Sequence, residues 1–212
     1  MIFLRYESFR GYLRLYPVNS ALIALNLVMF IVLLFNGGSQ NQETLVRFGA
    51  FLYGYDDPYG LAEPWRYVTS MFLHYGFEHL LFNMFSLLVF APPLERLVGS
   101  ALYAVFYLLS GIGGNVLSVI MDSKPYVMSV SVGASGAIYG VFGAFLFLAT
   151  MRKHWLDEAS RKTIYTMLII GIVYSLLMRG VNLWAHIGGA IVGFVLLYAL
   201  DRRVNRRLGR RP

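Results

Sequence analysis

The sequence predicts an all-α polytopic membrane protein, built as a six-transmembrane-helix bundle with a long first outer loop. The first observation is that 58% of the 212 residues are hydrophobic and only 14% are charged, whereas soluble domains average about half apolar and about a quarter charged. The second is that apolar runs of spanning length recur along the chain. The third is that basic residues gather at the chain ends and in one short loop. Together they indicate one membrane domain over residues 1–212.

Six segments are apolar and long enough, at roughly 20 residues, to cross a hydrocarbon core of about 30 Å as helices. The segments are Val18–Phe35, Phe77–Leu94, Ser100–Met121, Ala134–Met151, Thr163–Met178 and Val181–Leu200. The second contains His79 and Asn83, which lower its hydropathy, but Leu80–Phe90 is otherwise strongly apolar. No A-x-A-like cleavage site follows the first segment, so we expect it to stay as a span rather than act as a signal peptide.

The distribution of lysine and arginine predicts the orientation, because cytoplasmic loops carry an excess of these residues. With the N-terminus in the cytoplasm, all but four of the 18 basic residues lie on the cytoplasmic side. The exceptions are Arg47, Arg66, Lys124 and Arg179. Both termini are therefore expected to be cytoplasmic, as a basic N-terminus over 1–17 and a basic tail over 201–212. We interpret the tail as an anchor that contacts anionic lipid, and nucleic acid is not an expected partner.

The connection from Asn36 to Tyr75 is about 40 residues long, far above ordinary connection lengths, which favours a functional role. It is rich in aromatic side chains. These are Phe48, Phe51, Tyr53, Tyr55, Tyr59, Trp65, Tyr67 and Phe72. Amphipathic rings are favoured at the membrane–water interface. We therefore expect the loop to lie in the outer interface, with a passive aromatic belt as the simpler alternative.

Metal and cofactor chemistry has little support in the composition. The chain contains no cysteine, which excludes disulfides, iron–sulfur clusters and thiolate zinc sites. Four histidines and 11 acidic residues leave little material for other metal sites. We therefore expect no metal and no cofactor.

Polar residues inside membrane spans are costly, so each one is a candidate for function. His79 and Asn83 lie four residues apart and share one face of the second segment. Ser135 lies at the start of the fourth segment, and His186 lies near the start of the sixth. The second, fourth and sixth segments run in the same direction. These side chains therefore lie within roughly 10 Å of the outer end of their helices, so three helices place polar groups at one depth.

Glycines near these residues predict close packing of the fourth and sixth segments. Each segment has a pair in the GxxxG spacing that lets membrane helices approach closely. The pairs are Gly136 with Gly140 and Gly189 with Gly193. If these two faces meet, Ser135 and His186 lie at the same end of the contact.

A dyad of Ser135 and His186 is the chemistry that this arrangement allows, since a serine becomes a nucleophile beside a neutral imidazole. Tyr139 shares a helix face with Ser135 and could pack against the imidazole. The candidate donors for an oxyanion are His79, Asn83 and the backbone N–H of Ser135, which lies in the first turn of its helix.

Each of these elements also has a structural interpretation. The stretch GASGAIYG can serve helix packing alone, and His186 can be an interhelical hydrogen-bond donor. His79 with Asn83 can be a polar contact between helices. Ser129 and Ser131, in the outer loop, are rival nucleophiles. The residues interpreted as structural or solvated are His74 and His154.

The motifs, in this order, resemble those of the rhomboid family of intramembrane serine proteases, over the part of the chain from Trp65 to Gly193. The matching stretches are Trp65–Arg66, HYGFEHLLFN (His74–Asn83), Glu95–Arg96 with Gly99, GASG (Gly133–Gly136), Tyr139 and AHIGGAIVG (Ala185–Gly193). Tyr139 matches the tyrosine that stacks on the catalytic histidine of the family. G-x-S-G alone is weak evidence, but four motifs on the expected helices are specific.

The resemblance implies an intramembrane serine endopeptidase in which Ser135 is the nucleophile and His186 is the base. His79 and Asn83 would line the oxyanion site, and Gly133 would support it as the first glycine of the G-x-S-G motif. Substrates would be membrane proteins whose spanning helix is unstable near the outer face. The minimal six-helix form is the usual prokaryotic architecture, which implies a multi-pass protein of the plasma membrane with its active site near the outer face.

Two other classes of protein are weighed against the protease. A non-catalytic rhomboid-like module for membrane-protein binding or quality control would keep the long loop and lose the serine or the histidine. A channel or transporter would carry polar residues along a path across the whole bilayer. The sequence retains both Ser135 and His186 and clusters its polar residues on one side, which favours the protease. The oligomeric state stays open.

Overall fold

The structure is a computed structural model that describes residues 1–212 except 1, 5, 55, 123–127, 179 and 209–212. The side chains of 203 and 205–208 are not described either. Several predictions fall on these positions. Outside the described residues or side chains lie Arg5, Tyr55, Lys124, Arg179, Arg203, Arg206, Arg207, Arg210 and Arg211.

The described chain is mostly helical. Its helices are α1 (Phe9–Leu15), α2 (Pro17–Phe35), α3 (Gln42–Arg47), α4 (Arg66–Thr69), α5 (Gly76–Val98), α6 (Ser100–Asp122), α7 (Ser135–Met151), α8 (Glu158–Leu177) and α9 (Leu183–Leu208), with short 3-10 turns at Ser70–Phe72 and Lys153–Trp155. Two strands, β1 (Phe51–Tyr53) and β2 (Ser129–Ser131), form a small antiparallel ribbon. Each predicted span coincides with one of the six longest helices. The largest differences are that α8 begins at Glu158 and that α9 continues to Leu208.

In the described part of the chain, four helices are long and apolar enough to cross a membrane. They are Pro17–Phe35, Gly76–Val98, Ser100–Asp122 and the Leu183–Arg202 part of α9. Helix α7 is apolar but has 17 residues, and α8 begins with a charged turn that contains Glu158, Arg161 and Lys162. A helical, multi-pass membrane protein is therefore confirmed, whereas the count of six spans stays a prediction.

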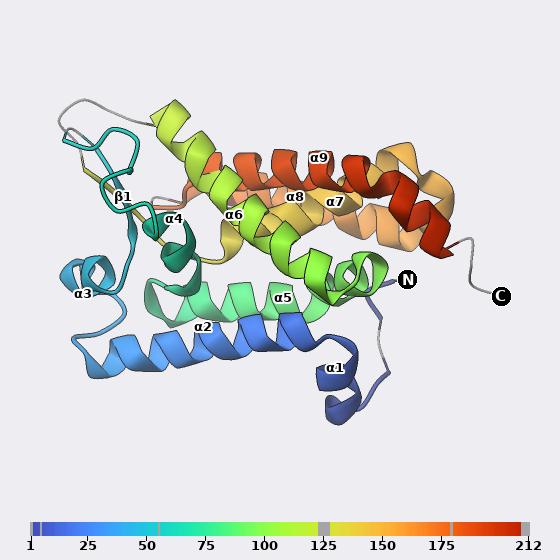
Figure 1. Ribbon diagram of the computed structural model, residues 1–212, viewed down its shortest axis with the longest axis horizontal. Helices are drawn as coiled ribbons and strands as arrows, with labels where there is room; N and C mark the ends of the chain where they lie inside the picture. Colours follow the sequence, from blue (N-terminus) through green and yellow to red (C-terminus); the bar gives the residue numbers. More distant parts are fainter. Residues whose placement is uncertain (1, 5, 55, 123–127, 179, 209–212) are drawn as a thin grey trace.

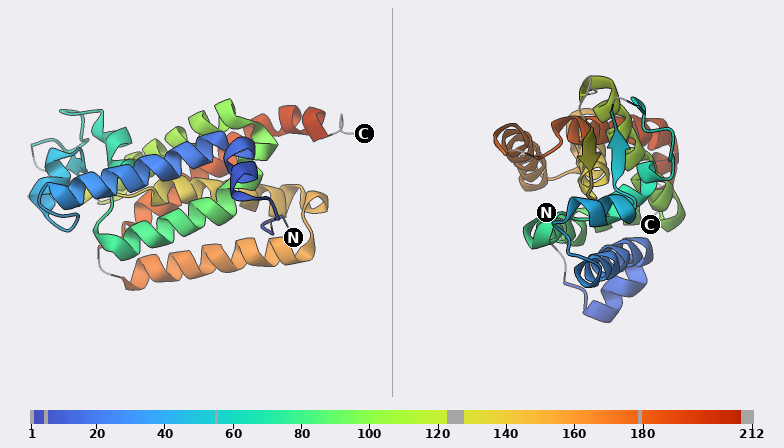
Figure 2. Two further views of the ribbon diagram at one scale, coloured as in Figure 1. Left: turned by 90° about the horizontal axis from the view of Figure 1, so that it is seen from below. Right: turned by 90° about the vertical axis from the view of Figure 1, so that its left-hand side faces the viewer.

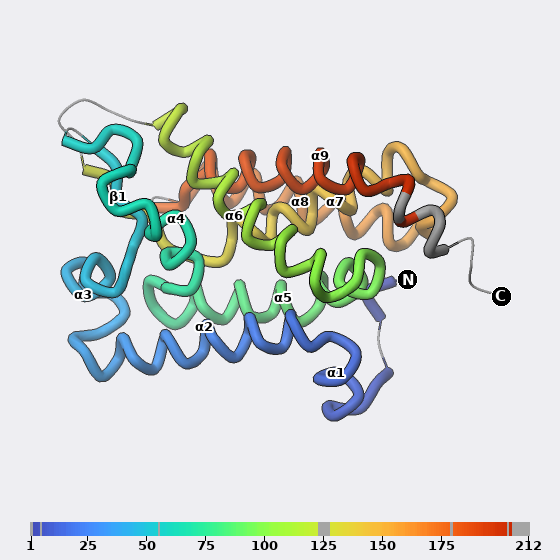
Figure 3. The backbone as a smooth tube through the Cα atoms, viewed as in Figure 1, coloured from blue at the N-terminus to red at the C-terminus, as the bar shows by residue number. Residues whose placement is uncertain are grey.

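Helices α5, α7 and α9 all begin at the end of the bundle where β1 and α3 lie (Figures 1 and 2). Helix α1 and the C-terminal end of α9 lie at the opposite end. Figure 3 shows α5 passing into α6 through a tight turn. Gly99 makes this turn with a φ of +90°, a conformation that glycine adopts without the steric cost of a Cβ. The first turns of α5, α7 and α9 therefore share one end of the molecule.

Helices α7 and α9 pack with their backbones in contact. A Cβ at Gly189 would overlap the carbonyl of Gly136, and a Cβ at Gly193 would overlap the carbonyl of Gly140. The two predicted GxxxG faces therefore meet, and that packing prediction is confirmed. Since no side chain separates the helices at these points, their spacing is fixed by the main chain itself.

Glu95, near the C-terminal end of α5, fixes the start of α2. Its side chain is buried. Oε1 accepts a hydrogen bond from the N–H of Val18 at 3.0 Å, and Oε2 accepts one from the N–H of Asn19 at 2.8 Å. First-turn N–H groups have no partner within their own helix, and a negative charge is favourable there. The Asn19 side chain in turn accepts a hydrogen bond from the Tyr103 hydroxyl, which joins α2, α5 and α6 at one end of the bundle.

The segment between α2 and α5 is folded rather than a passive aromatic belt. Phe51 and Tyr53 are buried and pack with Val119 of α6. Their strand β1 pairs with β2 in the register Phe51↔Ser131 and Tyr53↔Ser129. Tyr59 and Trp65, by contrast, are 61% and 55% exposed. A purely interfacial role is therefore wrong for Phe51 and Tyr53. Their strand β1 joins this segment to β2, the strand that precedes α7.

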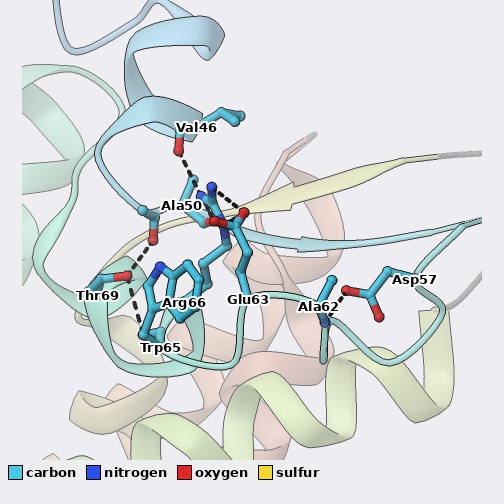
Figure 4. A network of polar contacts seen from close by, with 9 residues as sticks. Val46, Ala50, Asp57, Ala62, Glu63, Trp65, Arg66 and Thr69 are labelled. Atoms are coloured by element: carbon cyan, nitrogen blue, oxygen red, sulfur yellow. Dashed lines mark hydrogen bonds and ion pairs between the residues drawn. The ribbon is translucent and has the colours of Figure 1, made fainter.

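Arg66 holds the same segment together from within (Figure 4). Its Nη1 donates to the carbonyl oxygens of Val46 and Ala50 at 2.7 and 2.9 Å. Its Nε donates to Glu63 Oε2 at 2.6 Å. One guanidinium thus fixes the path of the chain that leads from α3 through β1 to α4, because its planar donors reach several acceptors at once.

His74 lies directly before α5 and is fully buried, with its ring centroid 5.0 Å from that of His79. Burial and, second, the neighbouring His79 ring lower the pKa of His74 from 6.5 to about 3. The ring is therefore neutral in the folded protein over the whole range in which a free histidine titrates.

We predict that Glu95→Ala destabilises the protein by about 3 kcal/mol, because two N–H groups of α2 lose a charged acceptor. Thermal unfolding of the detergent-solubilised protein measures this. The control is Glu158→Ala, which removes an acid that is paired with Lys162 on the surface of α8. An exposed pair contributes little, so the control should unfold like the wild type. Equal losses in the two variants would contradict the capping role.

We predict that His74 makes the protein acid-sensitive. Between about pH 6.5 and about pH 3, the unfolded chain binds a proton at His74 that the folded chain does not, so the stability of the fold decreases as the pH falls. From pH 7 to pH 5 this one group accounts for about 2 kcal/mol. His74→Gln should lose correspondingly less stability over that interval, whereas His154→Gln, at an exposed position, should lose as much as the wild type. Identical pH profiles for wild type and His74→Gln would contradict the prediction.

Candidate active site

Ser135 is the first residue of α7 and is half-buried. The first hydrogen bond of this helix runs from the N–H of Ile138 to the carbonyl of Ala134, at 3.0 Å. The N–H of Ser135 therefore has no acceptor within the helix and lies at the positive end of the helix dipole. Among the described residues this N–H makes no hydrogen bond, so a hydroxyl and an unused backbone donor belong to the same residue.

Gly133 brings the His79 ring next to Ser135. Its φ of +126° lies in a region that disfavours side chains. A Cβ here would lie 2.6 Å from His79 Cε1 and 2.7 Å from His79 Nε2, and 3.7 Å from Ser135 Oγ. The imidazole and the hydroxyl therefore approach one common point. The N–H of Gly133 donates to the carbonyl of Ser70 at 2.9 Å, which fixes this turn.

Asn83 lies one turn after His79 on α5 and is buried. Its Nδ2 donates one hydrogen bond to the carbonyl of His79, at 2.9 Å. An amide nitrogen carries two protons, and within the described residues this bond is the one that Nδ2 makes. The second N–H is therefore available for a ligand.

His186 lies in the first turns of α9 and is 6% exposed. The ring of Tyr139 stacks on it with a centroid distance of 4.0 Å and an interplanar angle of 6°. Its Nδ1 is 2.7 Å from the hydroxyl oxygen of Ser175 on α8. Ser175 is not among the residues that the sequence predicts for the site. The signal that could have found it is the small pair Gly171 and Ser175, four residues apart on one face of α8.

Ser135 and His186 are brought near each other by the packing of α7 against α9. Within the described residues no hydrogen bond joins the Ser135 hydroxyl to the His186 ring. The carbonyl of Ala185 lies 3.5 Å from the Cβ position of Gly136, so the backbones beside the two residues touch. Catalytic hydrogen bonds are often long before substrate binds and tighten in the complex. The backbone contact therefore places Ser135 and His186 at the same end of the α7–α9 interface.

The other candidates lie elsewhere. Ser129 and Ser131 belong to β2, and Ser131 Oγ accepts a hydrogen bond from Asn182 Nδ2 at 3.4 Å. In the described part of the chain neither serine bonds to a histidine. His154 lies in the turn after α7, beside Trp155. Across the described residues, no group of three or more histidine, aspartate or glutamate side chains is placed to hold a metal.

One family and several known proteins resemble this chain. The family model for the rhomboid domain matches residues 61–203. The protein named putative rhomboid protease YdcA of Bacillus subtilis (strain 168) is 35% identical over 206 residues, which are 97% of this chain and 100% of that protein. Rhomboid protease GluP of the same organism is 36% identical over 178 residues, covering 84% of this chain and 34% of GluP. Rhomboid-like protease 3 of Toxoplasma gondii is 31% identical over 185 residues, 84% of this chain and 67% of that protein. With most of its length matched by that domain and by proteins named rhomboid proteases, this chain belongs to the rhomboid family.

Proposed function

We propose that this protein is an intramembrane serine endopeptidase that hydrolyses peptide bonds in or near the transmembrane segments of membrane proteins, with Ser135 and His186 as its dyad. The observation that carries the proposal is that the first turns of α5, α7 and α9 bring their polar side chains together. The Ser135 hydroxyl and the His79 ring approach one point beside Gly133, and His186 stacks on Tyr139 of the helix that carries the serine. The relatives named rhomboid proteases support a protease rather than a binding module.

The reaction divides into two stages, acylation and deacylation, around one covalent intermediate. Ser135 Oγ attacks the carbonyl carbon of the scissile peptide bond, and its proton passes to His186. His186 then gives this proton to the nitrogen of the leaving amine as the C–N bond breaks. A water molecule hydrolyses the resulting ester in the same way, with His186 taking the water proton and returning it to Ser135 Oγ. No metal and no cofactor takes part.

The tetrahedral intermediates carry a negative oxygen, which needs donors that are already in place. The donors proposed are the N–H of Ser135, the His79 ring and the unused N–H of Asn83. The first belongs to a helix start, where the dipole favours an anion. The other two lie one turn apart on α5. Gly133 supports the site because any side chain there would displace His79.

The proposed topology has six spans, both termini in the cytoplasm and the active site near the outer face of a prokaryotic plasma membrane. Two observations support it. The starts of α5, α7 and α9 lie at the opposite end from α1 and the end of α9. All but four of the 18 basic residues fall on the side assigned to the cytoplasm. Lipid contacts of the basic tail follow from this orientation.

The substrates proposed are transmembrane proteins whose helix is easily unwound near the outer face. Within a helix each peptide group is hydrogen-bonded to its own segment, and in lipid an unwound segment has no water to replace those bonds. A scissile bond must therefore leave the helix before Ser135 can reach its carbonyl. Helix-weakening residues lower that cost.

We predict that Ser135→Ala and His186→Ala each abolish cleavage, because either change removes one half of the dyad. The measurement is proteolysis of a panel of single-span membrane-protein substrates by the detergent-purified protein. Ser129→Ala is the matched control, since it removes a serine hydroxyl from β2, and it should cleave at the wild-type rate.

Undiminished proteolysis by the Ser135 or the His186 variant would refute the dyad. A wild-type protein that binds these segments and cleaves none of them would favour the non-catalytic rhomboid-like binding or quality-control module instead.

We predict that Asn83→Ala lowers kcat about 10²- to 10³-fold and leaves measurable activity, because one oxyanion donor among several is removed. The control is Asn36→Ala. Asn36 makes the same bond to the carbonyl four residues earlier, at 2.8 Å, but lies at the exposed end of α2. Kinetics on one cleaved substrate compare the two. Complete inactivity of a correctly folded Asn83→Ala protein, or a loss of the same size in the control, would contradict the shared donor role.

A further inference from the structure

Helix α8 contributes one polar group to the surroundings of His186. Ser175 lies near the end of α8 and is 5% exposed. Its hydroxyl oxygen is 2.7 Å from His186 Nδ1 and also 2.7 Å from the carbonyl oxygen of Gly171, one turn earlier on the same helix. Both distances lie within the normal range of hydrogen bonds.

The number of protons decides the direction of these two bonds. A carbonyl oxygen has no proton to donate, so the bond to Gly171 uses the single hydroxyl proton of Ser175. The serine oxygen then meets His186 as an acceptor, which requires the proton of the neutral imidazole to be on Nδ1. Nε2, the other ring nitrogen, is left with a free lone pair. Both contacts are satisfied at once in this tautomer alone.

Gly171 and Ser175 both help to hold the His186 ring, Gly171 indirectly through Tyr139 and Ser175 by a direct contact. A Cβ at Gly171 would overlap the hydroxyl oxygen of Tyr139, so the glycine gives room to the ring that stacks on His186. Ser175 meets His186 at its edge. A face and an edge of the imidazole are thus both held, which removes the rotations that a ring in solution would make.

We propose that Ser175 is a positioning residue that holds His186 in the Nδ1–H tautomer, so that Nε2 keeps the lone pair that takes the proton of Ser135. The inference rests on the proposed function, since it concerns the same reaction. In catalytic triads a carboxylate fixes the tautomer of the histidine, and no acidic side chain among the described residues hydrogen-bonds to His186. A hydroxyl orients the ring without adding a charge that stabilises the imidazolium.

Kinetics test the positioning role. Ser175→Ala should lower kcat about 10- to 100-fold, the cost that is typical when a metal-bound histidine loses the partner that orients its ring, with KM changed less than about 2-fold. Ser175→Thr should recover most of the rate, because a threonine hydroxyl can also bond the carbonyl four residues earlier. The matched control is Thr163→Ala, which removes a hydroxyl that makes this same bond on the exposed side of α8, and it should leave kcat unchanged.

A spectroscopic measurement tests the tautomer without any substrate. In protein with ¹⁵N-labelled histidine, the ring-nitrogen shifts of His186, assigned by single histidine replacements, should show the proton on Nδ1. Ser175→Ala should shift the population toward Nε2–H.

Two results would overturn the proposal: a wild-type His186 protonated on Nε2, or a Ser175→Ala protein with the kcat of the Thr163→Ala control. Failure of the proposed function is a separate outcome. Cleavage that survives His186→Ala would remove the dyad, whereas the nitrogen shifts still decide whether Ser175 fixes the ring.

Discussion

The contact between α7 and α9 is made main chain to main chain, and the geometry of the site depends on it. At the glycine pairs no side chain separates the helices, so rotamer changes cannot alter their spacing. Ser135 and His186 take their positions from the first turns of these helices. At the far end Arg152 forms an ion pair with Asp201, which joins the end of α7 to α9. The proposed nucleophile and base therefore belong to one pair of helices whose ends are joined at both sides of the bundle.

Helix α8 meets this pair differently, through side chains and one glycine. The Tyr139 ring fills the space beside Gly171, and the Ser175 hydroxyl reaches the edge of His186. Such a contact orients a ring without setting the distance between helices. The division is physically reasonable, because catalysis needs both a fixed separation of reacting groups and a defined protonation state. The backbone contact provides the separation, and we assign the protonation state to Ser175.

Much of the helical framework is predictable from the sequence, because long apolar runs define spans almost independently of tertiary structure. The runs Val18–Phe35 and Ser100–Met121 differ from α2 and α6 by a single residue at one end. The glycine spacing likewise predicts the α7–α9 contact. What escapes prediction depends on partners that are distant in the chain. Three-residue strands have no usable periodicity, so the pairing of β1 with β2 is invisible, and Ser175 reads as an ordinary small polar residue until the fold brings it to His186. The convergence of Ser135 and His79 on one depth was predictable, whereas their catalytic roles stay predictions.

Arg66 ties its segment through two main-chain acceptors, the carbonyls of residues 46 and 50, and through the Glu63 side chain. A carbonyl is present whatever side chain its residue carries. The two carbonyl contacts therefore constrain the path of the backbone and not the side chains of residues 46 and 50, whereas the third contact depends on Glu63. Exposed side chains of this segment, such as Tyr59 and Leu61, can change without loosening the structure that leads to β2 and Ser135. The outer surface of this segment can thus vary while the backbone path beneath it stays the same.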